Sequence, residues 1–454
     1  MTGCSGEETA PETAMGEGVR SRAPVTRDVT DVRPATLVRV VDGDTGRLVR
    51  TAVVRIEDAA GRPDTLGVVR IEVEEPTPAE ARISAQGYIP RRLSVPFRSA
   101  KPVTVQIWRR SLQWPLYGAN PARTQAHPAI RVRPPFRVVW RRDMRSLLEF
   151  PAVVWEGVAY ITNYRGVLRA ISMRKGRVLW QKRVGKTVAS SPAVDPRRRE
   201  LVVTTKEPGG ARIVDLDTGK IRWGYRTARG EASPVIARGV AYFGDEGGRL
   251  YALDLRRRKM RWVFSGAGKI TSSPALSAGR VFFGDYGGRV YALNARSGRR
   301  LWSGSAGTRV YGTVAVARGR VFAPSVFSGL SALSARSGRL LWRIPVGAYL
   351  YSSPAYYRGR VYFGTYAGLV YCASAKSGRI LWRRNPGGSV SGAIVVVAGV
   401  VYAGSFNNRI TGWNWRTGRR LWTFPHGRYV PVSGNGGRLL MHGRRELWAV
   451  APKP

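Results

Sequence analysis

Short runs in which hydrophobic and polar residues alternate occupy the chain from residue 36 onward. Between residues 36 and 108 these runs are LVRVVD (37–42), AVVRIED (52–58), VVRIEVEE (68–75), ARISAQGY (81–88) and PVTVQIW (102–108). The segments DGDTGR (42–47) and AAGRPD (59–64) supply Asp, Gly and Pro where the chain must turn. Alternation with a period of two is typical of strands with one buried face. The pattern predicts a small β-sandwich of six or seven strands over residues 36–108.

A repeat with a period near 40 residues follows. Eight tryptophans mark it at spacings of 40, 43, 39, 40, 40, 40 and 40: Trp140, Trp180, Trp223, Trp262, Trp302, Trp342, Trp382 and Trp422. Each unit reads as four short strands, as in TSSPAL (271–276), RVFFGD (280–285), GRVYALN (288–294) and ARSGRRLW (295–302). Four strands in such a repeat are typical of a propeller blade, and each Trp is expected to pack between neighbouring blades.

The ends of the repeat array predict how the ring closes. Seven units lie between Trp140 and Trp422, and three more strands are expected near 429–434, 438–441 and 446–450. The strand FRVVW (136–140) would complete that last blade. We therefore expect an all-β protein with a tail at 1–35, a β-sandwich at 36–108, a linker at 109–135 and an eight-bladed propeller at 136–454.

The motifs of both folded parts resemble known families. The ending Gly-x-x-x-Trp-[Arg/Lys], the Ser-Pro-Ala before the next strands and the lead-in Trp114-Pro115-Leu116-Tyr117-Gly118 are similar to the pyrroloquinoline-quinone (PQQ) repeat. Quinoprotein alcohol dehydrogenases and the outer-membrane assembly lipoprotein BamB share that repeat. Residues 36–108 resemble a carboxypeptidase regulatory-like, transthyretin-like domain in Asp42, Thr45-Gly46, Ala52-Val53-Val54 and Ala85-Gln86-Gly87-Tyr88. This resemblance implies a stabilising or adhesive appendage.

The groups that a quinone-dependent dehydrogenase needs cannot be assembled from the sequence. Such an enzyme would use oxygen ligands for Ca²⁺, an Asp base and two adjacent cysteines, whereas Cys372 stands alone at a repeat position expected to be buried. The carboxylates Asp215, Asp217, Asp245, Glu246, Asp254 and Asp285 follow the repeat, and His127, His426 and His442 lack metal-ligand spacing. We expect no catalytic residue, metal or cofactor, and a non-enzymatic BamB-like scaffold. The alternative is a PQQ-dependent dehydrogenase or a relative with a degenerate site.

The charge of the chain is strongly positive and unevenly distributed. Residues 1–107 carry 15 basic and 15 acidic side chains, and residues 108–454 carry 60 and 14. Such an excess favours anionic partners, although Arg outnumbers Lys 65 to 10, as a GC-rich genome would produce without selection for a ligand. We expect a monomer that binds protein or an anionic cell-envelope polymer, with nucleic acid as a weaker alternative.

Loops that follow each Trp are expected to line one mouth of the channel. Successive blades place there a half-ring of cations and tyrosines suited to stacking and ion pairing: Lys186, Lys269, Arg309, Tyr349, Arg428 and Tyr429. Ordinary loop residues of an Arg-rich protein are the competing interpretation.

The first residues bear on localisation. Met-Thr-Gly-Cys resembles the end of a bacterial lipobox read from a miscalled start, with Cys4 as the lipidated residue, and residues 5–34 have the composition of a flexible tether. No run of 18 apolar residues occurs. We expect an extracytoplasmic protein, lipid-anchored or secreted. If Met1 is the true start, the protein is cytoplasmic.

Overall fold

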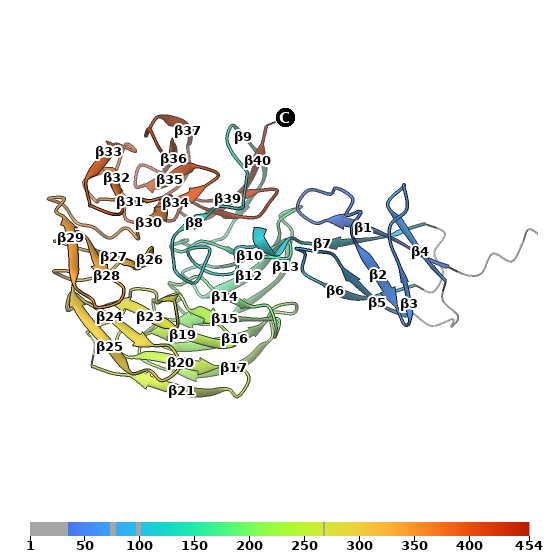
Figure 1. The fold of residues 1–454 in the computed structure, drawn as a ribbon, viewed down its shortest axis with the longest axis horizontal. Helices are drawn as coiled ribbons and strands as arrows, with labels where there is room; N and C mark the ends of the chain where they lie inside the picture. Colours follow the sequence, from blue (N-terminus) through green and yellow to red (C-terminus); the bar gives the residue numbers. More distant parts are fainter. Residues whose placement is uncertain (1–34, 73–78, 97–100, 267, 454) are drawn as a thin grey trace, which may run out of the picture.

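The computed structural model describes residues 35–72, 79–96, 101–266 and 268–453, and Cys4 lies outside them. The N-terminal part consists of two sheets packed on one core (Figure 1). One has the order β4-β1-β7 and the other β3-β2-β5-β6. Their bounds are β1 (Ala35–Asp42), β2 (Val53–Ile56), β3 (Ala59–Gly61), β4 (Val68–Glu72), β5 (Ala79–Ser84), β6 (Arg91–Val95) and β7 (Val103–Ile107).

The seven strands agree with the number predicted, but one predicted turn is wrong. Residues 59–61, expected to be a turn, pair with Val54–Ile56 as β3, and the reversal falls at Glu57, whose φ is 50°. Alternate residues of both sheets, such as Val40, Val54 and Ile107, are buried between them. This alternation is the physical reason that the period-two pattern located the strands.

Eight further sheets form the propeller, and each is built from consecutive antiparallel strands. The first four contain β10 (Val153–Trp155), β11 (Val158–Thr162), β12 (Val167–Ser172) and β13 (Val178–Arg183); β14 (Ala193–Asp195), β15 (Glu200–Thr205), β16 (Gly210–Asp215) and β17 (Ile221–Arg226); β18 (Val235–Ala237), β19 (Val240–Gly244), β20 (Leu250–Asp254) and β21 (Lys259–Phe264); β22 (Ala275–Ser277), β23 (Arg280–Gly284), β24 (Arg289–Asn294) and β25 (Arg300–Ser305).

The last four sheets complete the ring. They contain β26 (Ala315–Ala317), β27 (Arg320–Ser325), β28 (Gly329–Ser334) and β29 (Leu340–Ile344); β30 (Ala355–Tyr357), β31 (Arg360–Gly364), β32 (Val370–Ser374) and β33 (Ile380–Arg384); β34 (Val395–Val397), β35 (Val400–Ser405), β36 (Arg409–Asn414) and β37 (Arg420–Phe424), with β8 (Ala126–His127) added; and β38 (Val432–Gly434), β39 (Leu439–His442) and β40 (Glu446–Pro452), with β9 (Phe136–Asp143).

The two ends of the propeller meet in its last sheet. Strand β9 pairs antiparallel with β40, and Trp140 lies opposite Ala449. This confirms the prediction that the strand at Trp140 closes the last blade. Among the described residues, the only helical element is the short 3₁₀ turn Arg110–Leu112, and no helix is long and apolar enough to cross a bilayer.

Six of the eight repeat Trp rings lie against a glycine of the next blade. The indole nitrogen of Trp302 donates to the carbonyl of Ala335 at 3.2 Å, and its ring covers Gly338, where a Cβ would lie 2.5 Å from the ring. In the same way, the indole nitrogen of Trp140 donates to the carbonyl of Met173, and its ring covers Gly176. Gly338 also has φ +76°, which disfavours other residues. These contacts confirm the predicted packing role of Trp and explain the Gly of the repeat.

Hydroxyl side chains before the inner strands join the blades in a second way. The backbone N–H of Ser191, Ser233, Ser273 and Thr313 each donates to the side-chain oxygen of the next blade's residue: Ser233, Ser273, Thr313 and Ser353, at 2.9, 2.9, 3.3 and 2.9 Å. These buried serines and Thr313 therefore connect blades.

The segment 114–127, here called the channel segment, lies against the inner strands. Strand β8 pairs in parallel with β34. Carbonyls of the segment accept from inner-strand N–H groups: Trp114 from Val154, Pro115 from Val194, Pro121 from Leu276, Ala122 from Val316, Thr124 from Tyr356 and Gln125 from Val396. The residues between the two folded parts thus belong to the centre of the propeller.

Candidate functional site

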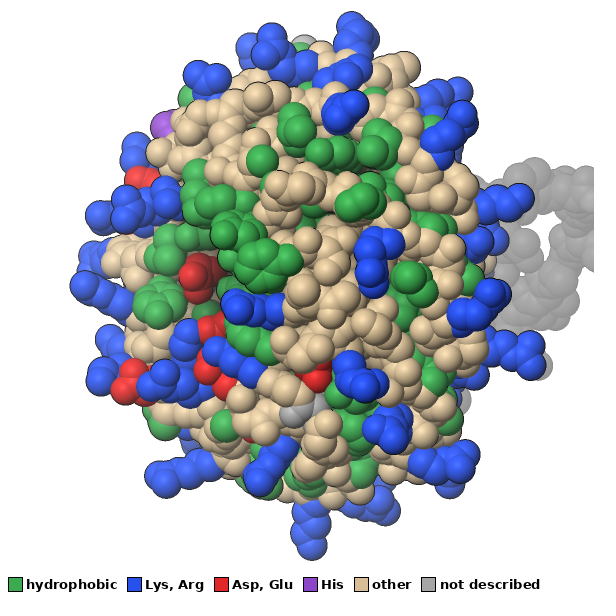
Figure 2. Space-filling model, turned by 90° about the vertical axis from the view of Figure 1, so that its left-hand side faces the viewer, with side chains coloured by type: hydrophobic (Ala, Val, Ile, Leu, Met, Phe, Trp, Pro, Cys, Tyr) green, Lys and Arg blue, Asp and Glu red, His purple; other side chains and the backbone are tan. Residues whose placement is uncertain are grey.

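The propeller has one face free of the N-terminal domain. That domain contacts the turn at Glu156–Gly157 between β10 and β11 and the turn at Asn435–Gly437 between β38 and β39. In an antiparallel blade, the β11–β12 type of hairpin and the loop to the next blade lie at the opposite end. We call this opposite end the hairpin face. Figure 2 shows the molecule from the side turned away from the N-terminal domain, where hydrophobic side chains gather beside acidic and basic ones.

A continuous row of aromatic rings crosses the hairpin face over four blades. The centroids of neighbouring rings lie 5.5–6.4 Å apart. In order along the row, the rings are those of Tyr286, Tyr311, Tyr351, Tyr366, Phe406 and Tyr429, and Tyr349 contacts both Tyr351 and Tyr366. We call these seven residues the aromatic arc. Tyr349 remains 46% exposed, Tyr366 40% and Tyr311 38%. Phe327 packs edge-on against Tyr349 at 5.2 Å and is 60% exposed.

Three cations lie on the rings of the arc. The Lys269 ammonium and the Arg309 guanidinium lie 5.1 and 4.8 Å from the centroid of Tyr286. The Arg428 guanidinium lies 4.6 Å from Phe406 and 5.8 Å from Tyr429. Each is within the range of a cation–π interaction. Five of the six residues predicted from the repeat therefore lie together: Lys269, Arg309, Tyr349, Arg428 and Tyr429.

Lys186 lies outside the arc. Its ammonium pairs with Glu207 at 3.2 Å, in the hairpin between β15 and β16, and it has no aromatic neighbour among the described residues. At the position of Tyr286 and Tyr366 this hairpin has Lys206, whose backbone N–H donates to Thr187 as that of Tyr286 donates to Lys269. No ring is present at that position, and Lys186 pairs with the next residue, Glu207.

Carboxylates border the arc on one side. Lys269 pairs with Glu246 at 2.9 Å, and Lys206 pairs with Glu231. Burial raises the pKa of Glu149, and the charge of Glu231 raises it further, although Lys206 lowers it. The mouth therefore combines an aromatic side with Lys and Arg and a mixed-charge side, so it is not a uniformly basic surface.

The hairpins that carry the arc are held by buried carboxylates. Asp285 accepts from the backbone N–H of Gly268 at 2.8 Å and Arg289 at 2.9 Å, and from the Tyr291 hydroxyl at 3.1 Å. Asp245 makes the equivalent bonds to Ala228, Arg249 and Tyr251. These two aspartates position backbone, as their regular places in the repeat predicted.

Several arc residues were absent from the predicted half-ring. Tyr286, Tyr366 and Phe406 share one hairpin position in three blades, and Tyr311 and Tyr351 share one position before two inner strands. A comparison of the repeat units at every position, and not only in the loops after Trp, could have found these residues.

The channel does not fit PQQ and Ca²⁺. Arg123 of the channel segment is fully buried, and its guanidinium donates to the carbonyls of Tyr117, Ser233, Pro234 and Pro274. Burial lowers its pKa to about 9. Within residues 35–453, leaving aside the undescribed gaps, no three His, Cys, Asp or Glu side chains are grouped to hold a metal ion. A calcium-bound quinone needs several oxygen ligands, whereas the buried Arg123 side chain in the channel offers only N–H donors.

Cysteine and histidine also have local roles. Cys372 is fully buried in β32, as predicted, and burial raises its pKa to about 11, which disfavours a reactive thiolate. His127 stacks on Trp114 at 5.3 Å, and His426 stacks on Trp448 at 4.6 Å. The Nε2 of buried His442 accepts from the N–H of Ala152 at 3.0 Å, and burial lowers its pKa to about 4.

Comparison with known proteins agrees with this geometry. The fold is that of a PQQ-like β-propeller: solved structures that resemble it include BamB from Moraxella catarrhalis (TM-score 0.60, 16% identity, 70% of this chain and 99% of that one) and a quinohemoprotein alcohol dehydrogenase from Comamonas testosteroni (TM-score 0.66, 13% identity, 76% and 81%). A europium-containing methanol dehydrogenase has a TM-score of 0.65 at 12% identity, over 75% and 98%. At these identities the likeness concerns the fold.

The particular family is defined by sequence. The model of the family described as outer membrane protein assembly factor BamB matches residues 136–265 and 259–452, and the chain belongs to this family. Curated BamB proteins of Nitrosomonas eutropha and Yersinia pestis are 31% identical over 134 residues and 24% identical over 141 residues. These alignments cover 28% and 27% of this chain and 31% and 35% of the relatives, so the chain spans about a third of their length.

Proposed function

We propose that this chain is a non-enzymatic, extracytoplasmic propeller scaffold that binds a protein partner through the aromatic arc. The observation that carries the proposal is the exposed row of rings with cations stacked on it, at the face that the N-terminal domain leaves free. Tyr and Arg dominate the energetically important positions of protein interfaces.

The arrangement of the arc favours binding because the rings support one another. Each aromatic pair contributes about 0.5–1.5 kcal/mol beyond burial of area, so the exposed rings are ordered before a partner arrives. An ordered surface loses less side-chain entropy on binding. One ion pair and four cation–π contacts of Lys269, Arg309 and Arg428 also hold charge beside the rings, which supports partners with carboxylates near apolar groups.

The family supports the class of partner. Relatives are named outer membrane protein assembly factor, and we extend assembly with envelope proteins to this chain as a proposal. An anionic envelope polymer is the second partner class, supported by the excess of 60 basic over 14 acidic side chains in residues 108–454.

We also propose that Cys4 carries the lipid anchor. Residues 36–108 would be a carboxypeptidase regulatory-like appendage, with 1–35 as tether, 109–135 as connection and 136–454 as propeller.

The alternative, a PQQ-dependent dehydrogenase, has weaker support. Structural neighbours named as dehydrogenases share only the fold, and the buried Arg123 of the channel segment offers N–H donors and no oxygen ligand. Adding PQQ and Ca²⁺ to the purified protein tests it: saturable binding of both in equal amounts, with alcohol oxidation, would favour the enzyme.

Affinity purification tests the binding function. Tagged full-length protein would be isolated from its native host as wild type and with Tyr349, Tyr366 and Phe406 all changed to Ser. The matched control changes Leu301, Leu340 and Ile380, which are 37–42% exposed on outer strands, to Ser. We expect proteins that accompany the wild type to be lost at least tenfold from the arc variant and retained by the control. Retention by both variants would overturn the proposal.

A further inference from the structure

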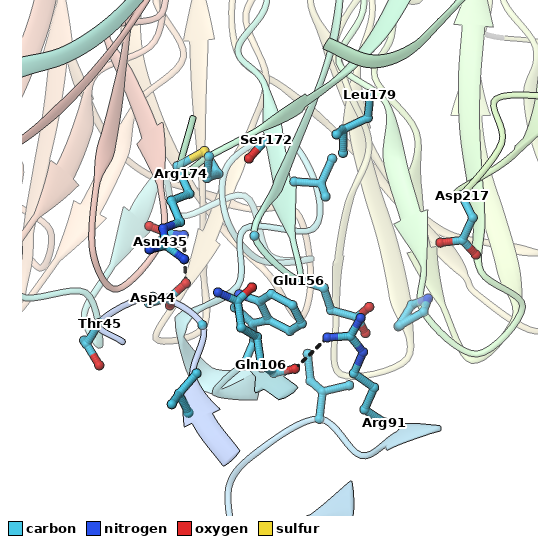
Figure 3. A pocket seen from close by; sticks show the side chains of 18 of the residues that line it. Asp44, Thr45, Arg91, Gln106, Glu156, Ser172, Arg174, Leu179, Asp217 and Asn435 are labelled. Carbon is cyan, nitrogen blue, oxygen red and sulfur yellow. Dashed lines mark hydrogen bonds between the residues drawn. The ribbon is translucent and has the colours of Figure 1, made fainter. Parts of the chain in front are cut away.

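A second concave surface lies at the other end of the propeller, between it and the N-terminal domain. This interdomain cleft has a volume of 1240 Å³ (Figure 3). One wall comes from the N-terminal domain, including Arg91 and Gln106, and the other from turns of the first two blades, including Arg174 and Asp217. The cleft is separate from the aromatic arc, which lies on the hairpin face.

Close contacts hold the two walls together. The carboxylate of Asp44 accepts from the side-chain amide of Asn435 at 2.8 Å and from the N–H of Gly436 at 3.1 Å (Figure 3). At Gly437 a Cβ would lie 2.3 Å from the carbonyl oxygen of Asp44, so only glycine allows this approach. Trp108 packs against Gly43 of its own domain and Gly157 of the first blade. The cleft is therefore a preformed site.

Cations without acidic partners line the cleft. Arg174 and Lys175, in the turn between β12 and β13, and Arg197, in the turn between β14 and β15, are exposed and make no ion pair among the described residues. Burial lowers the pKa of Arg438, and the positive charge of nearby Arg174 lowers it further. Seven Lys and Arg side chains line the cleft against the three carboxylates of Asp44, Glu156 and Asp217, and this positive excess favours binding of an anion.

Two further arginines are held in fixed positions. Arg91 donates to the carbonyl of Gln106 at 2.8 Å and lies 5.4 Å from the centroid of Trp108 (Figure 3). Arg199 pairs with Glu156 at 3.0 Å and Asp217 at 2.7 Å. The Arg199 fork is thus occupied by two carboxylates, whereas Arg91 uses one nitrogen for Gln106 and keeps further donors for a ligand. An ordered guanidinium such as that of Arg91 can bind a phosphate with little further loss of freedom.

We infer that the interdomain cleft binds a linear oligoanion bearing several phosphate groups. Its volume exceeds the range of about 300–1,000 Å³ for small-molecule pockets, which favours a ligand of several units. The cations come from separate turns of two domains, so each can meet a different group along an extended chain. Phosphates match the guanidinium fork and carry more charge per group than carboxylates.

Calorimetric titration of the full chain with tripolyphosphate, pyrophosphate and orthophosphate tests this site. The cleft variant is Arg174→Glu with Arg197→Glu. The matched control is Arg336→Glu with Arg318→Glu, which makes the same charge change in the same two types of turn, both in the fifth blade. The carbonyl of Arg336 accepts from Arg280 as that of Arg174 accepts from Arg438. If the Glu pair lowers the unfolding midpoint, the corresponding Gln pairs replace both variants.

We expect affinity to rise from one phosphate to three, and the cleft variant to weaken tripolyphosphate binding at least tenfold while the control changes it less than twofold. Equal weakening by both variants would show diffuse attraction to a basic surface and overturn the site. Tighter binding of hexaglutamate than of tripolyphosphate would overturn the assignment to phosphate. None of these results depends on a partner at the aromatic arc.

Discussion

The guanidinium of Arg123 donates to the carbonyl of Ser233 at 2.7 Å, although 110 positions separate them. This bond joins the channel segment to the third blade at the propeller centre, and further bonds reach Pro234 and Pro274. The serine itself connects blades through its hydroxyl. One residue before the repeats therefore stabilises several blades at once.

Arg123→Met is expected to lower the free energy of unfolding by about 3 kcal/mol, because it leaves several buried carbonyls without donors. Urea unfolding followed by tryptophan fluorescence measures the change. Arg131→Met, at an exposed position of the same connection, should change the free energy by less than about 0.5 kcal/mol. Equal effects would mean that the buried bonds contribute nothing specific.

Gly338→Ala tests the contact between Trp and the neighbouring blade. A left-handed conformation costs an L-residue about 1–2 kcal/mol, and displacement of the Trp302 ring adds about 1–3 kcal/mol. Gly319→Ala has a similar φ of +73° but open space around the new methyl, so it should show the backbone cost alone. Urea unfolding should place Gly338→Ala at least about 1 kcal/mol below Gly319→Ala, and the reverse order would contradict the packing role.

His442 makes stability depend on pH. Burial holds the folded pKa of His442 at about 4, below the ordinary histidine value of 6.5, so the unfolded chain binds the proton more readily between these values. Stability from neutral His442 is complete above pH 6.5 and is lost as pH falls toward 4, by about 3 kcal/mol. In His442→Gln this loss should be absent, so the free energy of unfolding in urea should change less between pH 7 and pH 4 than it does in wild type. An unchanged profile would contradict the neutral buried imidazole.

Asp44 should act in the opposite direction at the domain contact. Burial raises its pKa to about 7, so its contribution is complete below pH 3.8 and is lost as pH rises through 7. Asp44→Asn cannot ionise, and its amide keeps only one oxygen to accept from Asn435 or Gly436, so the domain contact should be weaker but should no longer change between pH 5 and pH 8. Limited proteolysis between the domains at the two pH values measures this. A difference between pH 5 and pH 8 as large in Asp44→Asn as in wild type would contradict the assignment.

Much of the fold could be predicted because the repeat places the same demand on every blade. Trp140 at the regular spacing identified both the blade period and the closing strand. The channel segment could not be predicted, since Arg123 bonds only backbone carbonyls and carbonyls carry no sequence signal. Within the site, the positions of Lys269 and Arg309 could be predicted from their loops. The pairing of Lys186 with Glu207 could not, because it depends on a neighbouring hairpin that has Lys206 where other blades have an aromatic ring.

Site-specific photo-cross-linking in the native host tests the central claim most directly. A photoreactive residue would replace Tyr349 or Tyr366 in the aromatic arc, and Leu301 or Leu340 on outer strands of comparable exposure would serve as controls. The proposed function predicts discrete protein adducts from both arc positions and none from the controls. Adducts from the outer strands with none from the arc would contradict a scaffold that binds through its hairpin face.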